Sequence, residues 1–391
     1  MPHEKLEDLQ PMTDGVSPIP VEEHERRVDK ARRLMVDHGL DAMYLEAGSS
    51  LRYFTGVRWA RSERMLAAVV PARGEIAYVS PAFEEARLRE MLLFGDDVRT
   101  WQEHEDPREL VAGIFADRGL ATGMIGIEET VRFFLFDGIR RRAPQCQLLS
   151  ADAVTIGCRA RKSPAEIALM QRAMDITVRA YRVAMSLLTE GMSQDEFRAN
   201  AAAAHKALGV QGGIDVQFGP STAFPHGSKT PTRLRAGDVV LMDGGCTVEG
   251  YHSDISRTIV FGEPTRRQRD IWSLEKRAQA AAFAAAQVGA PCETVDTAAR
   301  AVIAEAGFGP DYEVPGLPHR TGHGIGLDVH EAPHLVRGNT MPLAPGMCFS
   351  NEPMIAIYGE FGVRLEDCMV ITEDGPRFFT QPSQSIEQPF A

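Results

Sequence analysis

The chain has 391 residues, enough for two domains with separate cores. Its formal net charge of -12 argues against a nucleic-acid partner, which would favour a basic face. No run of about 18 apolar residues and no basic-then-apolar N-terminus is present, so neither a membrane partner nor a signal peptide is indicated. The six cysteines include no CxxC pair, which argues against a thiolate zinc site and a disulfide framework. The cytoplasm is therefore the expected location.

The first 158 residues predict an arm followed by a small α/β domain. Residues 1–20 contain several prolines and are expected to lack structure of their own. The stretch 49–56 is interpreted as turn-rich, and no catalytic constellation is evident in this half. Its histidines, His24, His38 and His104, are expected at the surface. Apolar periodicity predicts, in chain order, a helix at 22–38, strands at 41–45, 65–70 and 75–80, a helix at 83–92 and a strand at 123–127.

Residues 159–391 predict a second, α+β domain. Ser163, Ser193 and Thr265 each precede a glutamate or glutamine by three residues, which is the signature of a capping box at a helix start. The order of elements is helix, helix, sheet, and then helix, helix, sheet again. This order predicts two similar halves packed face to face. The predicted ranges are a helix from 163 to about 190, a helix from 193 to about 208, a β region at 214–260, helices at 265–288 and 293–306, and a β region at 314–372.

Two aspartates in the first β region are predicted to lie on one face of a hairpin. If Glu249 and Gly250 form a two-residue turn, Gly245 faces Asp254 on the returning strand. Asp243, two residues earlier, then lies on the same face and diagonal to Asp254. Such diagonal neighbours are about 7–8 Å apart at the backbone, so two short carboxylate arms can reach metal ions between them.

Two glutamates and one histidine in the second β region show a similar arrangement. If the hairpin after Glu352 has its apex at Gly359, Glu352 lies directly opposite Glu366. Between the two hairpins, the run TGHGIG presents the imidazole of His323 from a loop rich in glycine. The two acidic pairs and this imidazole can therefore converge.

A convergence of four carboxylates and one imidazole indicates metal binding. Buried carboxylates close together repel one another and need cations or protons to be stable. Four negative charges match two divalent cations, and oxygen-rich ligands favour Mn²⁺ over Co²⁺ or Zn²⁺, which the same ligands can also bind. Taken singly, each residue has a simpler interpretation: a solvated turn aspartate, a structural histidine, or a glutamate (Glu366) paired with Arg364. Their joint occurrence favours a dinuclear hydrolytic centre.

The stretches that carry these residues resemble the metal-binding motifs of the pita-bread metallopeptidases of the creatinase, aminopeptidase P and prolidase type. The resemblance covers roughly residues 163–391 and implies a C-terminal pita-bread fold of two pseudo-symmetric halves. Residues 21–158 more loosely resemble the creatinase-like N-terminal domain, which methionine aminopeptidases lack. The matching stretches are Met242-Asp243-Gly244-Gly245, Ser253-Asp254-Ile255-Ser256-Arg257-Thr258, Gly322-His323-Gly324-Ile325-Gly326, Asn351-Glu352-Pro353 and Arg364-Leu365-Glu366-Asp367.

The resemblance implies a role for each of the five metal ligands. Asp243 would chelate one ion, and Asp254 and Glu366 would bridge both ions. His323 and Glu352 would complete the other ion.

The resemblance also implies roles around the metal ions. His226 and His330 match positions that contact substrate and transition state, although histidines packed in loops are the simpler interpretation. Glu352 would accept a proton from water and pass it to the leaving nitrogen, and Arg364 would orient Glu366.

The implied activity is that of a homodimeric Xaa-Pro dipeptidase acting on short proline-containing peptides, with a metal-bridging hydroxide as nucleophile. Tyr358 is displaced from the position where aminopeptidase P-like members carry a tyrosine, and neither the relay tyrosine nor the substrate-anchoring arginine of many relatives is identified. Aminopeptidase P activity therefore stays open. The same scaffold also suits an ectoine hydrolase, a dimethylsulfoniopropionate lyase, a creatinase or a binding module, although the full ligand set argues against the last two.

Overall fold

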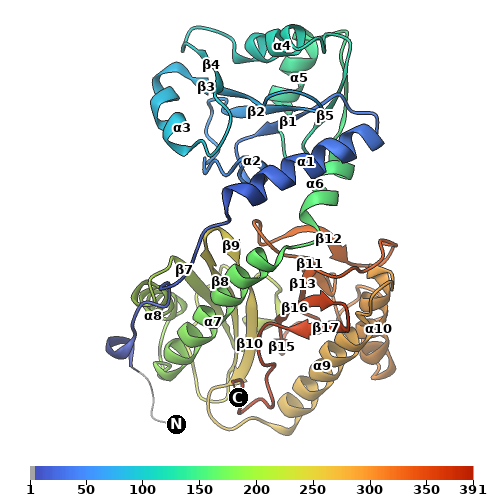
Figure 1. Ribbon diagram of the computed structural model, residues 1–391. Helices are drawn as coiled ribbons and strands as arrows, with labels where there is room; N and C mark the ends of the chain where they lie inside the picture. The colour runs from blue at the N-terminus through green and yellow to red at the C-terminus, as the bar shows by residue number, and fades with distance from the viewer. Residues whose placement is uncertain (1–4, 391) are drawn as a thin grey trace. The chain divides into compact units, whose positions relative to one another are not determined.

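The computed structural model describes residues 5–390, which divide into two compact units (Figure 1). The smaller unit is Ser17–Arg159. The larger unit combines the described residues before Ser17 with those from Ala160 onward. Within residues 5–390, no helix is both apolar enough and long enough to cross a lipid bilayer.

The smaller unit is built on one mixed sheet with the strand order β4-β3-β2-β1-β5-β6. Helices α4 and α5 lie on one face of this sheet, and α1, α2 and α6 lie on the other (Figure 1). The strands are β1 (Ala42–Glu46), β2 (Ala67–Pro71), β3 (Ala77–Pro81), β4 (Asp97–Trp101), β5 (Met124–Ile127) and β6 (Gln147–Ser150). The helices are α1 (Val21–Asp37), α2 (Ser49–Thr55), α3 (Glu85–Met91), α4 (Pro107–Asp117), α5 (Phe133–Arg142) and α6 (Asp152–Arg159). The α/β character of this unit was predicted.

Two expectations for this unit are wrong. The stretch 49–56 contains the short helix α2, because most of its side chains pack into the interior and the left-handed Gly56 ends it only after two turns. His24 is buried rather than exposed, and its Nδ1 lies 2.9 Å from the carbonyl oxygen of Tyr53. Both errors arise because burial by residues distant in sequence leaves no local signal.

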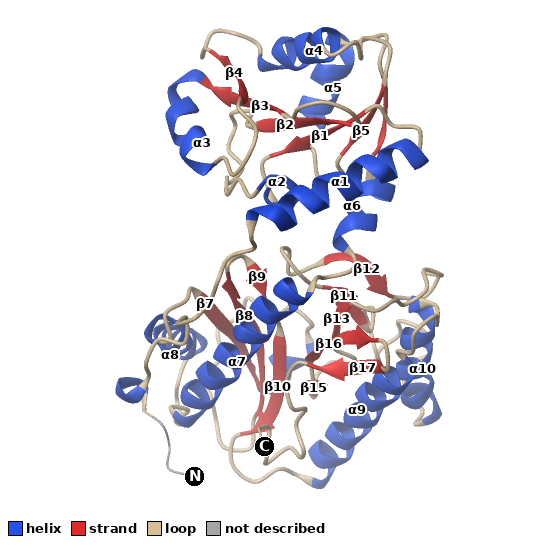
Figure 2. Ribbon diagram, viewed as in Figure 1, coloured by secondary structure: helices blue, strands red, loops and turns tan. Residues whose placement is uncertain are grey.

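The larger unit contains the order helix, helix, sheet twice, as predicted (Figure 2). Helices α7 (Pro164–Ser186) and α8 (Gln194–Ala207) precede the first sheet, and α9 (Arg266–Ala285) and α10 (Cys292–Glu305) precede the second. The first sheet contains β7 (Gly212–Phe218), β8 (Val239–Val248), β9 (Tyr251–His252) and β10 (Ile255–Val260). The second contains β11 (Gly322–Gly324), β12 (Glu331–Leu335), β13 (Cys348–Asn351), β16 (Asp367–Thr372) and β17 (Gly375–Phe378), with the separate hairpin β14 (Met354–Ile357) and β15 (Phe361–Arg364).

The three capping boxes fix where the long helices of this unit begin. The side chains of Ser163, Ser193 and Thr265 each accept a hydrogen bond from the backbone N–H three residues later. The side chain of the glutamate or glutamine at that third position accepts a hydrogen bond from the backbone N–H of the capping residue. Two otherwise unpaired N–H groups are satisfied at each helix start. The fold is the pita-bread type that the sequence predicts.

Candidate metal centre

The first acidic pair comes from the hairpin of β8 and β10. Ser256 pairs with Asp243 in a register that runs unbroken from the turn, and this register places Asp254 across from Gly245. The two aspartates therefore share a face, as predicted. A Cβ on Gly245 would lie 2.0 Å from the carbonyl oxygen of Ser253, so only glycine allows this close approach of the strands.

The second acidic pair lies where two ladders meet. Met354 pairs with Arg364 in the β14–β15 hairpin, and the same register continues in the β13–β16 ladder. Glu352 and Glu366 occupy the positions between these ladders and face each other, as predicted. The backbone N–H of Glu366 donates to the carbonyl of Ser256 at 3.1 Å, which joins this pair to the first hairpin.

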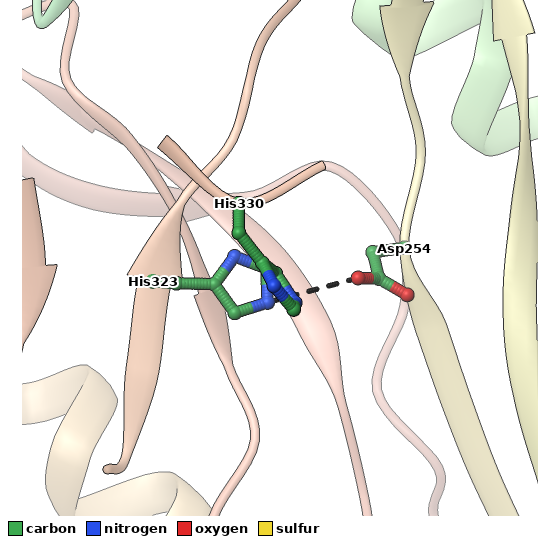
Figure 3. Close-up of side chains that lie close together, drawn as sticks. All are labelled: Asp254, His323 and His330. Carbon is green, nitrogen blue, oxygen red and sulfur yellow. Dashed lines mark ion pairs between the residues drawn. The ribbon is translucent and has the colours of Figure 1, made fainter. Parts of the chain in front are cut away.

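His323 approaches the carboxylates from the short strand β11 rather than from a loop. Its Nε2 lies 3.1 Å from Glu352 Oε1 and 3.7 Å from Asp254 Oδ2. Its Nδ1 lies 3.1 Å from the carbonyl oxygen of Gly324, and because a carbonyl only accepts, Nδ1 carries the hydrogen. Figure 3 shows the imidazoles of His323 and His330 close together and facing Asp254. The contact of Nδ1 with the Gly324 carbonyl orients the ring so that the His323 Nε2 faces the carboxylates.

All five predicted ligands converge. Three overlapping sets of side chains bring one potential ligand atom from each member within 4.8 Å of the others. Asp254 and Glu366, the two residues expected to bridge the ions, each belong to two of these sets, as does His323. The sets are Asp243, Asp254 and Glu366; His323, Glu352 and Glu366; and Asp254, His323 and His330.

The charges at this cluster fit bound cations. Burial, followed by the charge of Asp243, raises the pKa of Asp254 to about 8. Burial and the charge of Asp254 raise the pKa of Glu366 well above its ordinary value. Burial also opposes ionisation of Glu352, but in the absence of metal the hydrogen bond and the charge of a protonated His323 outweigh burial and lower that pKa to about 2. Glu366 Oε1 is buried without a hydrogen-bond partner among residues 5–390, so the donor set has an oxygen left for a metal ion.

Ser256 and Arg364 form a polar link beneath the carboxylates. The Ser256 hydroxyl lies 3.0 Å from Asp243 Oδ1 and 2.7 Å from Glu366 Oε2. Arg364 pairs with Asp243 at 2.6 Å and also donates to the Ser256 hydroxyl. The prediction that Arg364 orients Glu366 is therefore corrected: in the described structure its carboxylate partner is Asp243, and Ser256 connects it to Glu366. The sequence analysis did not identify Ser256, although it stands two residues after Asp254.

One cavity of about 320 Å³ contains the whole constellation. Its wall includes the five predicted ligands together with His226, His330 and Arg364, so every predicted site residue lies in one place. Two further polar residues, His319 and Arg320, were missed. They directly precede the TGHGIG run, and this proximity is the only signal that could have found them.

Arg320 places a positive charge in this wall. Burial and the charge of Arg320 lower the pKa of His334 to about 4. The pKa of His330 is lowered by burial and the charge of His323, with a contribution from Arg320. His330 is therefore neutral at pH 7.

A fold of this type with a carboxylate-rich cavity defines a metal-dependent peptidase. The family model for metallopeptidase family M24 matches residues 168–373, and that for the creatinase/prolidase N-terminal domain matches residues 27–161. The chain belongs to metallopeptidase family M24.

Similar proteins cover nearly the whole chain. A probable dipeptidase PepE of Mycobacterium tuberculosis strain H37Rv is 36% identical over 90% of this chain and 93% of its own length. An Xaa-Pro dipeptidase of Lactobacillus helveticus is 33% identical over 92% of this chain and 98% of its own. The crystal structure of dipeptidase PepE from Mycobacterium ulcerans superposes with a TM-score of 0.87 at 33% identity, covering 94% of this chain and 98% of that one.

Proposed function

We propose that this protein hydrolyses the Xaa-Pro bond of dipeptides at a centre of two divalent metal ions. The observation that carries the proposal is the convergence of four carboxylates and one imidazole in a single cavity. The Xaa-Pro dipeptidase named among the relatives supports the substrate class.

The proposed ligands are those predicted from the sequence. Asp243 would hold one ion, Asp254 and Glu366 would reach both, and His323 with Glu352 would complete the other. The oxygen-rich set favours Mn²⁺ over softer ions. Two such ions, when bound, lower the pKa of a bound water and polarise the peptide carbonyl.

The chain's own groups then move protons and stabilise charge. Glu352 is ionised at neutral pH and is positioned to accept the proton of the attacking water and deliver it to the proline nitrogen. His330 and His226 are exposed in the cavity wall and would donate hydrogen bonds to the oxyanion or the substrate carbonyl.

Binding of the ions is expected to release protons. With a pKa of about 8, the carboxyl of Asp254 is mostly protonated at pH 7 until a cation displaces its proton. Titration of Mn²⁺ into chelator-treated protein should therefore give heats that depend on the ionisation enthalpy of the buffer, with about one proton or more released. The dependence should weaken at pH 9, where the carboxyl is already ionised. Equal heats in all buffers at pH 7 would contradict this assignment.

Arg320 is the group we propose for recognition of the substrate's end. Arg320 lies in the same cavity wall as the proposed ligands, and a guanidinium matches a carboxylate in shape and charge. The free carboxylate of an Xaa-Pro dipeptide would bind there, whereas a longer peptide offers a neutral amide instead. This assignment favours a dipeptidase over an aminopeptidase.

Arg320→Ala is expected to raise KM for Gly-Pro by roughly 10- to 100-fold, the effect of losing one charge-assisted hydrogen bond. The kcat should change much less, and the preference for dipeptides over tripeptides should shrink. Steady-state kinetics with Gly-Pro and Gly-Pro-Ala measure both effects. Arg320→Lys keeps the charge and should retain part of the affinity, and an unchanged KM in Arg320→Ala would contradict the role.

A substrate panel tests the proposed function as a whole. Gly-Pro, Leu-Pro, Xaa-Pro tripeptides, ectoine and dimethylsulfoniopropionate are offered with added Mn²⁺. We expect cleavage of the dipeptides in preference to the other compounds. Turnover of ectoine or dimethylsulfoniopropionate without dipeptide cleavage would replace the proposal.

We also propose a cytoplasmic homodimer. All six cysteines are buried and unpaired, as suits a reducing compartment. A twofold dimer is the most common assembly of soluble oligomers. Light scattering on the purified protein measures the assembly.

A further inference from the structure

The segment that brings His319 and Arg320 into the cavity is a long irregular loop. It joins α10, which ends at Glu305, to β11, which begins at Gly322. A loop of this length has few backbone hydrogen bonds of its own and depends on other groups to hold its shape. The residues that hold it therefore determine where this wall of the cavity stands.

A buried ion pair on α10 makes hydrogen bonds to this loop. Asp296 and Arg300 lie one turn apart, with Arg300 Nε 2.9 Å from Asp296 Oδ2. They are only 1% and 9% exposed. Arg300 also donates to the carbonyl oxygen of Leu317 at 3.0 Å and to that of His319. The planar guanidinium thus fixes the loop at the residue that enters the cavity.

The carboxylate of Asp296 extends this contact to a metal ligand. Its Oδ1 accepts from the backbone N–H of Thr321 at 3.1 Å and from the Thr321 hydroxyl at 2.7 Å. The carbonyl of Thr321 in turn accepts the backbone N–H of Glu352 at 2.9 Å. One buried carboxylate is therefore connected through a single residue to the backbone of Glu352.

We propose that Asp296 and Arg300 are positioning residues of the active site. Arg300 sets the wall that carries His319 and Arg320, and Asp296 sets the backbone at Thr321 and Glu352. Neither side chain is among the cavity-lining residues that the structure describes around the ligands, so both act through other residues. The inference rests on the proposed function for its kinetic test.

The two contacts predict different kinetic effects. Arg300→Lys keeps the positive charge but loses the fork that reaches several carbonyl groups, and it should raise KM for Gly-Pro about tenfold. Asp296→Asn keeps the shape but removes the charge that orders Thr321, and it should lower kcat about tenfold because Glu352 is displaced. Both variants should still bind Mn²⁺, measured by elemental analysis.

Glu23 and Arg27 provide a matched control. They form another buried ion pair one helical turn apart, at 2.7 Å on α1 of the smaller unit. Arg27→Lys should lower the Tm while kcat and KM stay within about twofold of the parent protein. The kinetics of Asp296→Asn and Arg300→Lys are measured below the melting temperature of each variant. The proposal would be overturned if both variants also kept kcat and KM within about twofold of the parent protein.

Two further measurements keep the proposal testable. If the ion-pair variants do not fold, Thr321→Val removes only the hydroxyl bond; a threefold or larger change in kcat or KM supports the proposal, and unchanged kinetics overturn it.

Amide hydrogen exchange needs no substrate, so it separates this inference from the proposed function. Faster exchange at Thr321 and Glu352 in Asp296→Asn supports positioning even if Gly-Pro is not cleaved, and unchanged exchange overturns it.

Discussion

Asp254→Ala and Glu366→Ala are each expected to abolish metal retention and hydrolysis together. Both carboxylates are buried between the two hairpins, and each lies within ligand distance of four other acidic or imidazole side chains. Removing either takes a ligand from both proposed ions at once, so the remaining groups hold each ion too weakly to survive dialysis. Elemental analysis after chelation and Mn²⁺ reloading measures retention, and Gly-Pro hydrolysis measures activity.

A matched aspartate controls for the loss of one negative charge. Asp374 is exposed at the turn between β16 and β17, and Asp374→Ala should leave both metal content and turnover unchanged. Full activity of Asp254→Ala or Glu366→Ala after exhaustive chelation would contradict the bridging assignment.

His330→Ala is expected to separate catalysis from metal binding. The His330 ring centroid lies 4.0 Å from that of His323, and the side chain is exposed in the cavity wall. Partial desolvation in the cavity wall and the charge of His323 lower its pKa, so at neutral pH it is an uncharged hydrogen-bond donor. Losing this donor should slow turnover by about 10²–10³-fold. Two metal ions per chain should remain.

Metal content decides between the two roles open to His330. The side chain also lies within ligand distance of Asp254 and His323, so geometry alone would permit coordination. Loss of metal from His330→Ala would make it a ligand and would contradict its assignment as a donor. His38 is exposed at the end of α1, and His38→Ala is the control that should change neither quantity.

The convergence of the proposed ligands was predictable because the position of a hairpin turn determines which residues of its two strands face each other. A turn at Glu249 and Gly250 fixes which face carries Asp243 and Asp254, and an apex at Gly359 sets Glu352 against Glu366. The long helices were predictable for a similar reason, since capping boxes and apolar spacing are local signals. In both cases the information lies within about 20 neighbouring residues.

The remaining features depend on contacts between distant segments. The pairing of Arg364 with Asp243 joins residues of different halves, and the hydroxyl of Ser256 becomes important only because Glu366 approaches it. His319 and Arg320 lie in the cavity wall, and their loop is positioned by a hydrogen bond from Arg300 on α10 to the carbonyl oxygen of His319. No periodicity or spacing in the sequence encodes such contacts.

Anomalous diffraction from crystals soaked in MnCl₂ tests the central claim most directly. We predict two manganese peaks per chain in the cavity, separated by about 3.5–4 Å as in other two-metal hydrolytic sites. Asp254 and Glu366 should contact both peaks, and Asp243, His323 and Glu352 should contact one each. Peaks elsewhere, or ligand side chains that leave the cavity for bulk solvent, would contradict the account.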